Sequence, residues 1–331
     1  MVSVFCPGIS GYREACYVFY IIMNKQLCGK EINMSKKSKL IRVTWKASDA
    51  KRDAGLTTPE DIRRFDNLQY GKDAVWNLLD VYRPRAAEGK LPVIVNVHGG
   101  GWVYGDKELY QFYGMSLAQR GFAVVNFTYR LAPEAKFPSA VEDMNAVITW
   151  MYENQETYGL DMEHVFFVGD SAGGNLAAMY SAICTNPGYA AKFAFKVPQG
   201  FAPTAVGLNC GAYVLFGHHE LLHESQDKEL IMEDLLPEHG SPREQELVNV
   251  PDHVTAAFPP VYLMTALGDF CRPQAQFMEE ALKKNGVYYE FGLFGTEKEP
   301  LYHVFHVNIR ESEGQRCNDI ECDFFRRMME K

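Results

Sequence analysis

Short apolar runs alternate with longer amphipathic stretches from about residue 75 to residue 295 of the chain. Several of these runs are continuous and rich in Val, Ile and Phe, which is typical of strands that are buried on both faces of a sheet. The predicted strands cover residues 76–82, 92–97, 122–129, 164–168, 211–216, 260–266 and 288–294.

Helical patterns fill the intervals between the runs. Residues 108–120 and 273–285 are each followed directly by a glycine, which is a common helix stop. Residues 138–158 keep five apolar side chains on one helical face: Val141, Met144, Val147, Ile148 and Met151. The alternation predicts an α/β protein with a mostly parallel sheet and helices on both of its faces.

Two segments interrupt this alternation. Residues 34–74 are mixed and partly polar, and residues 217–255 are rich in Glu and His with little strand pattern. Ligands bind at the carboxyl ends of the strands in open α/β sheets, so we expect both segments to supply cap elements there. We expect residues 34–331 to form a single domain, preceded by an N-terminal extension over residues 1–33.

Composition and charge limit the classes of molecule that the protein is expected to bind. The chain has 331 residues, a net charge of −9 and 47% hydrophobic residues, so we expect a globular protein that binds neither nucleic acid nor an anionic membrane. The apolar run at residues 15–23 is too short to span a bilayer, and we expect no stable membrane insertion. It lacks a strongly basic flank and a small-residue cleavage site, so export is the less favoured alternative.

Cysteine spacing points to a reducing compartment. The eight cysteines are scattered and no pair has CxxC spacing, which is more typical of free thiols than of a disulfide framework. We therefore expect a cytoplasmic protein. The sequence leaves a homodimer open.

The strongest chemical signal is the stretch VFFVGDSAGGNLAA at residues 165–178. A predicted strand leads into Gly169-Asp170-Ser171-Ala172-Gly173, and an Ala-rich helix follows at once. This is the GxSxG pattern in the strand–turn–helix context that exposes a nucleophilic serine. The helix N-terminus behind Ser171 offers free N–H groups to a developing oxyanion.

A second signal is HGGGW at residues 98–102, directly after a predicted strand. Three consecutive glycines lower the stability of a fold, and they are expected where backbone N–H groups must approach a ligand closely. Acyl transfer by a serine needs both a nucleophile and donors for the oxyanion, so the two motifs support one another.

The acid and the base must follow Ser171 along the chain in this arrangement. Asp269 lies just after the predicted strand at residues 260–266, and His303 and His306 lie in a loop after the last predicted strand. The order Ser, Asp, His is therefore satisfied. The pattern alone leaves either histidine as the base.

The chain resembles the hormone-sensitive-lipase branch of the α/β hydrolases, a family of esterases and lipases. The resemblance covers roughly residues 75–310. It rests on HGGGW, on YRLAPEAKFPSAVED at residues 129–143, on GDSAGGN at residues 169–175 and on the strand ending at Asp269. It implies the α/β-hydrolase fold, with an eight-stranded, mostly parallel sheet, helices on both faces and a small cap.

The same resemblance implies the roles of individual residues. Ser171, Asp269 and His303 would form a catalytic triad, and the backbone N–H groups of Gly100, Gly101 and Ala172 would form the oxyanion hole. The substrate would be a small carboxylic ester, with no cofactor and no metal. The family usually has His-Gly-Phe where this chain has His303-Val304-Phe305, so His303 aligns through its phenylalanine and His306 is the alternative.

Other functions compete with a short-chain carboxylesterase. A carbohydrate acetyl esterase or an amidase could use the same triad, and a non-catalytic ligand-binding protein could use the same fold. The string His219-Glu220-Leu221-Leu222-His223 matches the HExxH zinc pattern, but it lies in an irregular, His- and Glu-rich segment. We therefore expect zinc to take no part in the reaction.

Overall fold

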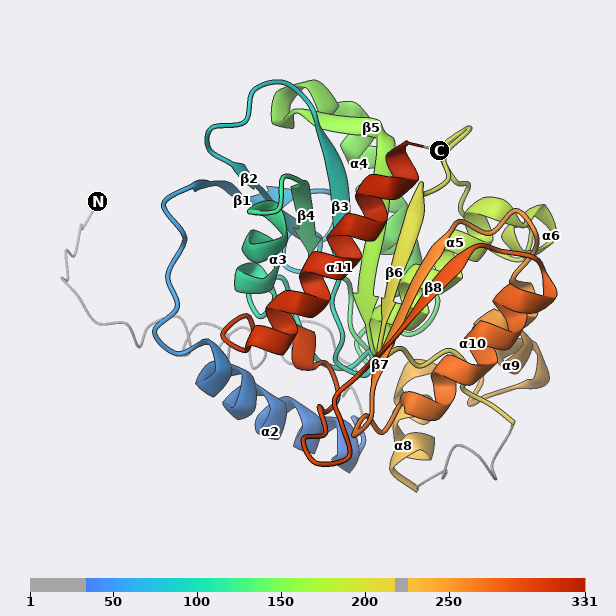
Figure 1. Cartoon of the computed structure of the whole chain (residues 1–331). Coiled ribbons are helices and arrows are strands. Elements are labelled where there is room, and N and C mark those ends of the chain that lie inside the picture. Colours follow the sequence, from blue (N-terminus) through green and yellow to red (C-terminus); the bar gives the residue numbers. More distant parts are fainter. Residues whose placement is uncertain (1–33, 218–225, 331) are drawn as a thin grey trace, which may run out of the picture. The chain divides into compact units, whose positions relative to one another are not determined.

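The computed structural model describes residues 34–217 and 226–330, and only the backbone of residues 226–230. Ser35–Lys331 group into one compact unit, which contains every element discussed below. An eight-stranded sheet is its framework, with the strand order β1-β2-β4-β3-β5-β6-β7-β8 (Figure 1).

The elements follow one another as strands and helices for most of the unit. The strands are β1 (Ile62–Gln69), β2 (Leu78–Pro84), β3 (Leu91–Val97), β4 (Ala123–Phe127), β5 (Leu160–Asp170), β6 (Ala205–Asn209), β7 (Val261–Ala266) and β8 (Tyr289–Phe294). The helices are α2 (Lys36–Asp53), α3 (Gln111–Ala118), α4 (Ser139–Tyr158), α5 (Ala172–Thr185), α6 (Pro187–Ala190), α8 (Gln226–Leu235), α9 (Pro242–Val248), α10 (Arg272–Lys284) and α11 (Ser312–Met329). Two short 3₁₀ turns are η1 (Val250–His253) and η2 (Phe305–Val307).

Most of the sheet is parallel, as predicted. The neighbours from β4 through β3, β5, β6 and β7 to β8 are all parallel, whereas β1 pairs with β2, and β2 with β4, in antiparallel register. Parallel neighbours end at the same edge of a sheet. The loops that follow β3, β5 and β7 therefore meet at one edge, which is where ligands bind in such sheets.

Helices cover both faces of the sheet. On β3, Val93 and Val95 belong to the apolar core that includes side chains of α4, α5 and α10. Ile94 points the other way, into a second core with side chains of α3 and α11, and Figure 1 shows these two helices lying over the same face. Burial on both faces explains why the strands appear in the sequence as continuous apolar runs.

The structure corrects two expectations. The predicted strand at 211–216 is wrong, because these residues form a loop and the strand at this place in the sheet is β6. The segment 34–74 does not consist of cap elements alone, because it contains β1, which extends the sheet as an edge strand.

Helix α2 is tied to loops at the carboxyl ends of the strands. Arg42 donates hydrogen bonds to the Val103 carbonyl at 2.7 Å and to the Glu134 carboxylate at 2.7 Å. At its N-terminus, the side chain of Ser35 accepts a hydrogen bond from the Ser38 N–H, as a helix cap does. No helix of the described residues is long and apolar enough to cross a membrane.

Candidate active site

Ser171 lies in a tight turn between β5 and α5. Its backbone has φ 53° and ψ −118°, a combination that residues other than glycine rarely adopt. A Cβ atom at Gly173 would lie 2.0 Å from the Val97 carbonyl oxygen, so no larger residue fits there. The local sequence therefore holds the serine in a strained strand–turn–helix, the geometry in which a nucleophile elbow exposes its side chain.

The glycine loop after β3 lies beside this turn. Gly100 has φ +116°, and a Cβ there would lie 1.9 Å from the Tyr104 carbonyl oxygen, so the loop conformation requires glycine. Among the described residues, the N–H groups of Gly100, Gly101 and Ala172 donate no backbone hydrogen bond. These groups are available to a ligand oxygen.

A tyrosine and a histidine brace the glycine loop. Tyr110 accepts a hydrogen bond from the Gly99 N–H at 3.0 Å and donates one to the Asp170 carboxylate at 2.9 Å. The His98 ring stacks on Tyr129 with centroids 4.0 Å apart, and its Nδ1 lies 2.7 Å from the Gly99 carbonyl oxygen. Burial lowers the pKa of His98 to about 4, so the ring is neutral near pH 7 and supports the loop.

Asp269 follows β7 and contacts His303 directly. The His303 Nδ1 lies 2.6 Å from the Asp269 Oδ1. The carboxylate also accepts hydrogen bonds from the Thr265 hydroxyl at 2.9 Å and from the Cys271 N–H at 2.8 Å. Burial opposes ionisation of Asp269, but the hydrogen bond and charge of His303, together with the other donors, outweigh it and lower the pKa of the carboxyl group.

His306 occupies a different environment. It is fully buried, its ring packs edge-on against Tyr113 with centroids 5.4 Å apart, and neither ring nitrogen has a hydrogen-bond partner among the described residues. Burial lowers the pKa of His306 to about 3. The structure therefore brings His303, and not His306, against Asp269.

Ser171 and His303 line the same cavity, which has a volume of about 230 Å³. Gly99, Gly100 and Phe270 also contribute to its wall. The cavity therefore brings together the serine, the histidine and the glycine loop predicted from the sequence.

Helix α2 supplies the other wall of this cavity, the candidate catalytic cavity. Trp45, Ser48, Asp49 and Arg52 line it. Asp49 accepts hydrogen bonds from the Tyr104 hydroxyl at 2.8 Å and from Arg52 at 2.9 Å, and burial raises the pKa of Asp49. This polar wall was not predicted from the sequence, because the alternating charges of α2 resemble a solvent-exposed helix face.

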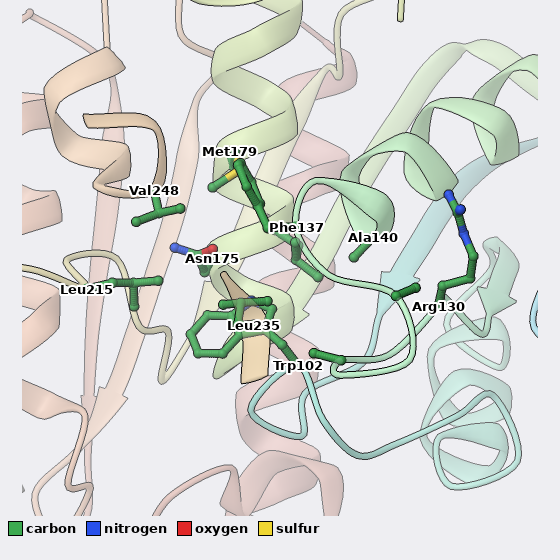
Figure 2. Close-up of a pocket in the computed structure, with 12 residues that line it drawn as sticks. Trp102, Arg130, Phe137, Ala140, Asn175, Met179, Leu215, Leu235 and Val248 are labelled. Carbon is green, nitrogen blue, oxygen red and sulfur yellow. The ribbon is translucent and has the colours of Figure 1, made fainter. Parts of the chain in front are cut away.

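A second cavity lies next to Trp102 and is far smaller. Figure 2 shows apolar side chains around it, including Leu215, Leu235 and Val248, with the Asn175 amide among them. Its volume is about 10 Å³, which is roughly the space of a single water molecule. The cavity is therefore too small, as it stands, to hold part of a substrate.

The HExxH string falls outside the described residues, since His219, Glu220 and His223 lie in the segment 218–225. The expectation that this string binds no catalytic zinc therefore stays a prediction from sequence.

Comparison with known proteins shows the family to which the chain belongs. The family model BD-FAE matches residues 79–267, which is more than half of the chain. The carboxylesterase NlhH of Mycobacterium tuberculosis is 33% identical over 138 residues, which cover 40% of this chain and 43% of NlhH. The versiconal hemiacetal acetate esterase of Dothistroma septosporum is 27% identical over 218 residues, which cover 62% of this chain and 65% of that enzyme. The chain thus spans less than two thirds of the length of these curated relatives.

Solved structures extend the similarity over most of the chain. Esterase B from Lactobacillus rhamnosis, in complex with an inhibitor, is 26% identical with a TM-score of 0.81, and the match covers 89% of this chain and 97% of esterase B. This similarity and the sheet topology confirm the predicted α/β-hydrolase fold. The chain belongs to the BD-FAE family and is an α/β-hydrolase related to carboxylesterases.

Proposed function

We propose that the protein is a serine carboxylesterase that hydrolyses short-chain acyl esters through Ser171, Asp269 and His303. The observation that supports this most strongly is the hydrogen bond of 2.6 Å between His303 and Asp269, at a cavity that His303 shares with Ser171. Esterase relatives with the same fold support the reaction class.

In the proposed reaction, Asp269 holds the Nδ1–H of His303, so that the opposite ring nitrogen, Nε2, is free to act as a base. His303 takes the proton of the Ser171 hydroxyl as its oxygen attacks the ester carbonyl. The same histidine then protonates the leaving alcohol, and water repeats the sequence to release the acid from Ser171.

The proposed oxyanion hole consists of the N–H groups of Gly100, Gly101 and Ala172. The absence of backbone acceptors for these groups among the described residues supports the assignment. Donors fixed before the reaction stabilise the negative oxygen of the tetrahedral intermediate, and each such donor typically contributes about 10²- to 10³-fold to the rate. Tyr110 holds Gly99 and therefore helps to fix the loop.

Cavity dimensions favour a short acyl group. Each buried CH₂ contributes roughly 0.8 kcal/mol, so a long-chain enzyme needs an extended apolar tunnel. The catalytic cavity has a volume of about 230 Å³, and its α2 wall includes Ser48, Asp49 and Arg52. The apolar cavity next to Trp102 leaves no room for a chain.

The polar α2 wall favours one alternative, a carbohydrate acetyl esterase. Asp49, Arg52 and the Tyr104 hydroxyl offer donors and acceptors that could bind a hydroxylated alcohol. An acetylated sugar that is turned over faster than nitrophenyl acetate would favour this alternative over a simple aliphatic esterase.

A nitrophenyl ester series from acetate to decanoate tests the proposal. We expect kcat/KM to be highest between acyl lengths of about C2 and C6, and we expect Ser171→Ala to abolish turnover while the thermal midpoint stays close to that of the unmodified protein. A maximum at C10 or longer would contradict the short-chain assignment. Turnover by Ser171→Ala near the original rate would contradict the mechanism.

A further inference from the structure

Cys210 is a buried thiol next to the proposed acid and base, and the proposed reaction makes no use of it. It follows β6, its N–H donates to the Met264 carbonyl of β7 at 2.7 Å, and it is 1% exposed. Its φ of 49° is in the left-handed region, which is uncommon for cysteine. This backbone turn places the side chain beside the Asp269 carboxylate, with the sulfur within 4.8 Å of a carboxylate oxygen.

Three different ligand atoms meet at this point. The Cys210 Sγ, a carboxylate oxygen of Asp269 and a ring nitrogen of His303 all lie within 4.8 Å of one another. Within the described part of the chain, this is the one group of three or more Cys, His, Asp or Glu side chains whose ligand atoms are close enough to share a metal ion. Thiolate, imidazole and carboxylate are together the donor set that Zn²⁺ prefers, and a thiolate favours soft cations further.

We propose that Cys210, Asp269 and His303 bind a thiophilic divalent cation such as Zn²⁺ or Cd²⁺, and that binding reversibly inhibits hydrolysis. The inhibitory part rests on the proposed roles of Asp269 and His303. The site differs from a catalytic zinc site because it blocks the base and activates no water.

Ligand geometry explains why binding and catalysis exclude each other. Zn–N and Zn–O bonds of about 2.0–2.2 Å at a tetrahedral ion separate the two donor atoms by roughly 3.3 Å. The His303 Nδ1 and Asp269 Oδ1 are now 2.6 Å apart, so the ion must push the imidazole away and break their hydrogen bond. Zn–S and Zn–N bonds place sulfur and nitrogen roughly 3.5 Å apart, a separation that a shift of about 1 Å can reach.

Proton accounting gives the same result. On binding, the Cys210 thiol loses its proton to solvent, the Asp269 carboxylate is already ionised, and the imidazole proton moves from Nδ1 to Nε2. A histidine that is bound to metal through Nδ1 and protonated at Nε2 has no lone pair left for the proton of Ser171. The base is blocked without any change to the nucleophile.

Cations can approach the site from two sides. His303 and Phe270 line the catalytic cavity. Asp269 and Phe270 also line a wider surface groove together with residues of α10.

Inhibition by Zn²⁺ and Cd²⁺ in the full-length protein tests the proposal. We expect reversible inhibition that EDTA relieves. Cys210→Ser should raise the inhibition constant by on the order of 100-fold, because loss of even a residue that only supports a metal ligand weakens metal binding by about 10- to 100-fold. Cys271→Ser is the matched control, because Cys271 is a second buried cysteine that does not belong to the group of three ligand residues, and the inhibition constant of this variant should stay unchanged. Equal inhibition of the Cys210→Ser and unmodified proteins, or no inhibition of either, would overturn the site.

A spectroscopic titration separates this proposal from the proposed function. Titration of Ser171→Ala with Cd²⁺ should give a thiolate-to-metal charge-transfer band that disappears in the Ser171→Ala, Cys210→Ser double variant, with Cys210→Ala as a second variant should serine disturb folding. A band that does not depend on Cys210 would overturn the cation site even where esterase activity is present. A Cys210-dependent band, together with no esterase activity in the unmodified protein, would support the cation site and refute the proposed function.

Discussion

Glu321 of α11 is a buried carboxyl group whose ionisation should destabilise the fold. It is 1% exposed, and its Oε1 accepts a hydrogen bond from the Asn209 amide at 2.8 Å. Its Oε2 has no partner among the described residues, and the Tyr113 and Tyr262 hydroxyls are unpartnered there as well. Burial raises the pKa of Glu321 from 4.5 to about 7, although the Asn209 hydrogen bond acts in the opposite direction.

The direction of the pH effect follows from this raised pKa. The folded protein holds the Glu321 proton up to about pH 7, whereas the unfolded chain releases it near pH 4.5. The stability from this group is therefore fully present below pH 4.5 and is lost as the pH rises to about 7. A shift of this size corresponds to about 3 kcal/mol of unfolding free energy.

Glu321→Gln removes the ionisation and keeps an acceptor for Asn209. We expect the stability of the variant relative to the unmodified protein to rise by about 3 kcal/mol between pH 4.5 and pH 8, since glutamine does not titrate. The difference in thermal midpoint should widen by on the order of 5 °C over that range, as measured by scanning fluorimetry or calorimetry.

A matched control is Glu313→Gln, which changes an exposed glutamate of the same helix that pairs with Arg316. Its effect on stability should be small compared with that of Glu321→Gln, because an ion pair near the surface contributes little. Parallel stability curves for Glu321→Gln and the unmodified protein between pH 4.5 and pH 8 would refute the assignment of a neutral buried acid.

Three further outcomes follow from the site. His303→Ala should lower kcat/KM by about 10⁴-fold or more, whereas His306→Ala should keep substantial activity despite some loss of stability; the reverse pattern in steady-state assays would make His306 the base. Tyr110→Phe removes the hydroxyl that holds Gly99, and it should lower kcat by about tenfold with a small change in KM. Equal kcat values for the variant and the unmodified protein would contradict this role of Tyr110. Exhaustive chelation should leave hydrolysis unchanged or relieve inhibition, and a loss that added zinc restores would point to a catalytic metal.

The tight turn around Ser171 was predictable because its information is local. The strand, the turn and the helix around Ser171 all lie between residues 160 and 185, and the glycines that permit the turn stand next to the serine. The parallel strands were predictable for a related reason, since burial on both faces gives continuous apolar runs.

The wrong prediction of a strand at 211–216 shows the limit of what a continuous apolar run can indicate. The N–H groups of Tyr213 and Val214 donate to the Gln274 side chain at 3.0 and 2.8 Å, and the N–H of Leu215 donates to Asn249 at 2.8 Å. Side chains distant in sequence thus satisfy the backbone in place of a neighbouring strand. An apolar run that is buried as a loop looks the same in sequence as one that is buried in a sheet.

The residue pattern alone left His303 and His306 open, and only the family resemblance favoured His303, because the difference between the two lies in three-dimensional packing. The two residues are three positions apart, yet one contacts Asp269 and the other is enclosed beside Tyr113. The contribution of Asp49 and Arg52 to the cavity could likewise not be predicted from the sequence, because it depends on where α2 lies relative to the strand ends.

Covalent labelling tests the role of Ser171 most directly. A phosphonate ester that mimics the tetrahedral intermediate should add once per chain, and peptide mass spectrometry should locate the adduct on Ser171. Loss of nitrophenyl ester hydrolysis should follow the extent of labelling, and Ser171→Ala should acquire no adduct. An adduct on another residue, or full hydrolysis by protein completely labelled at Ser171, would contradict the proposed nucleophile.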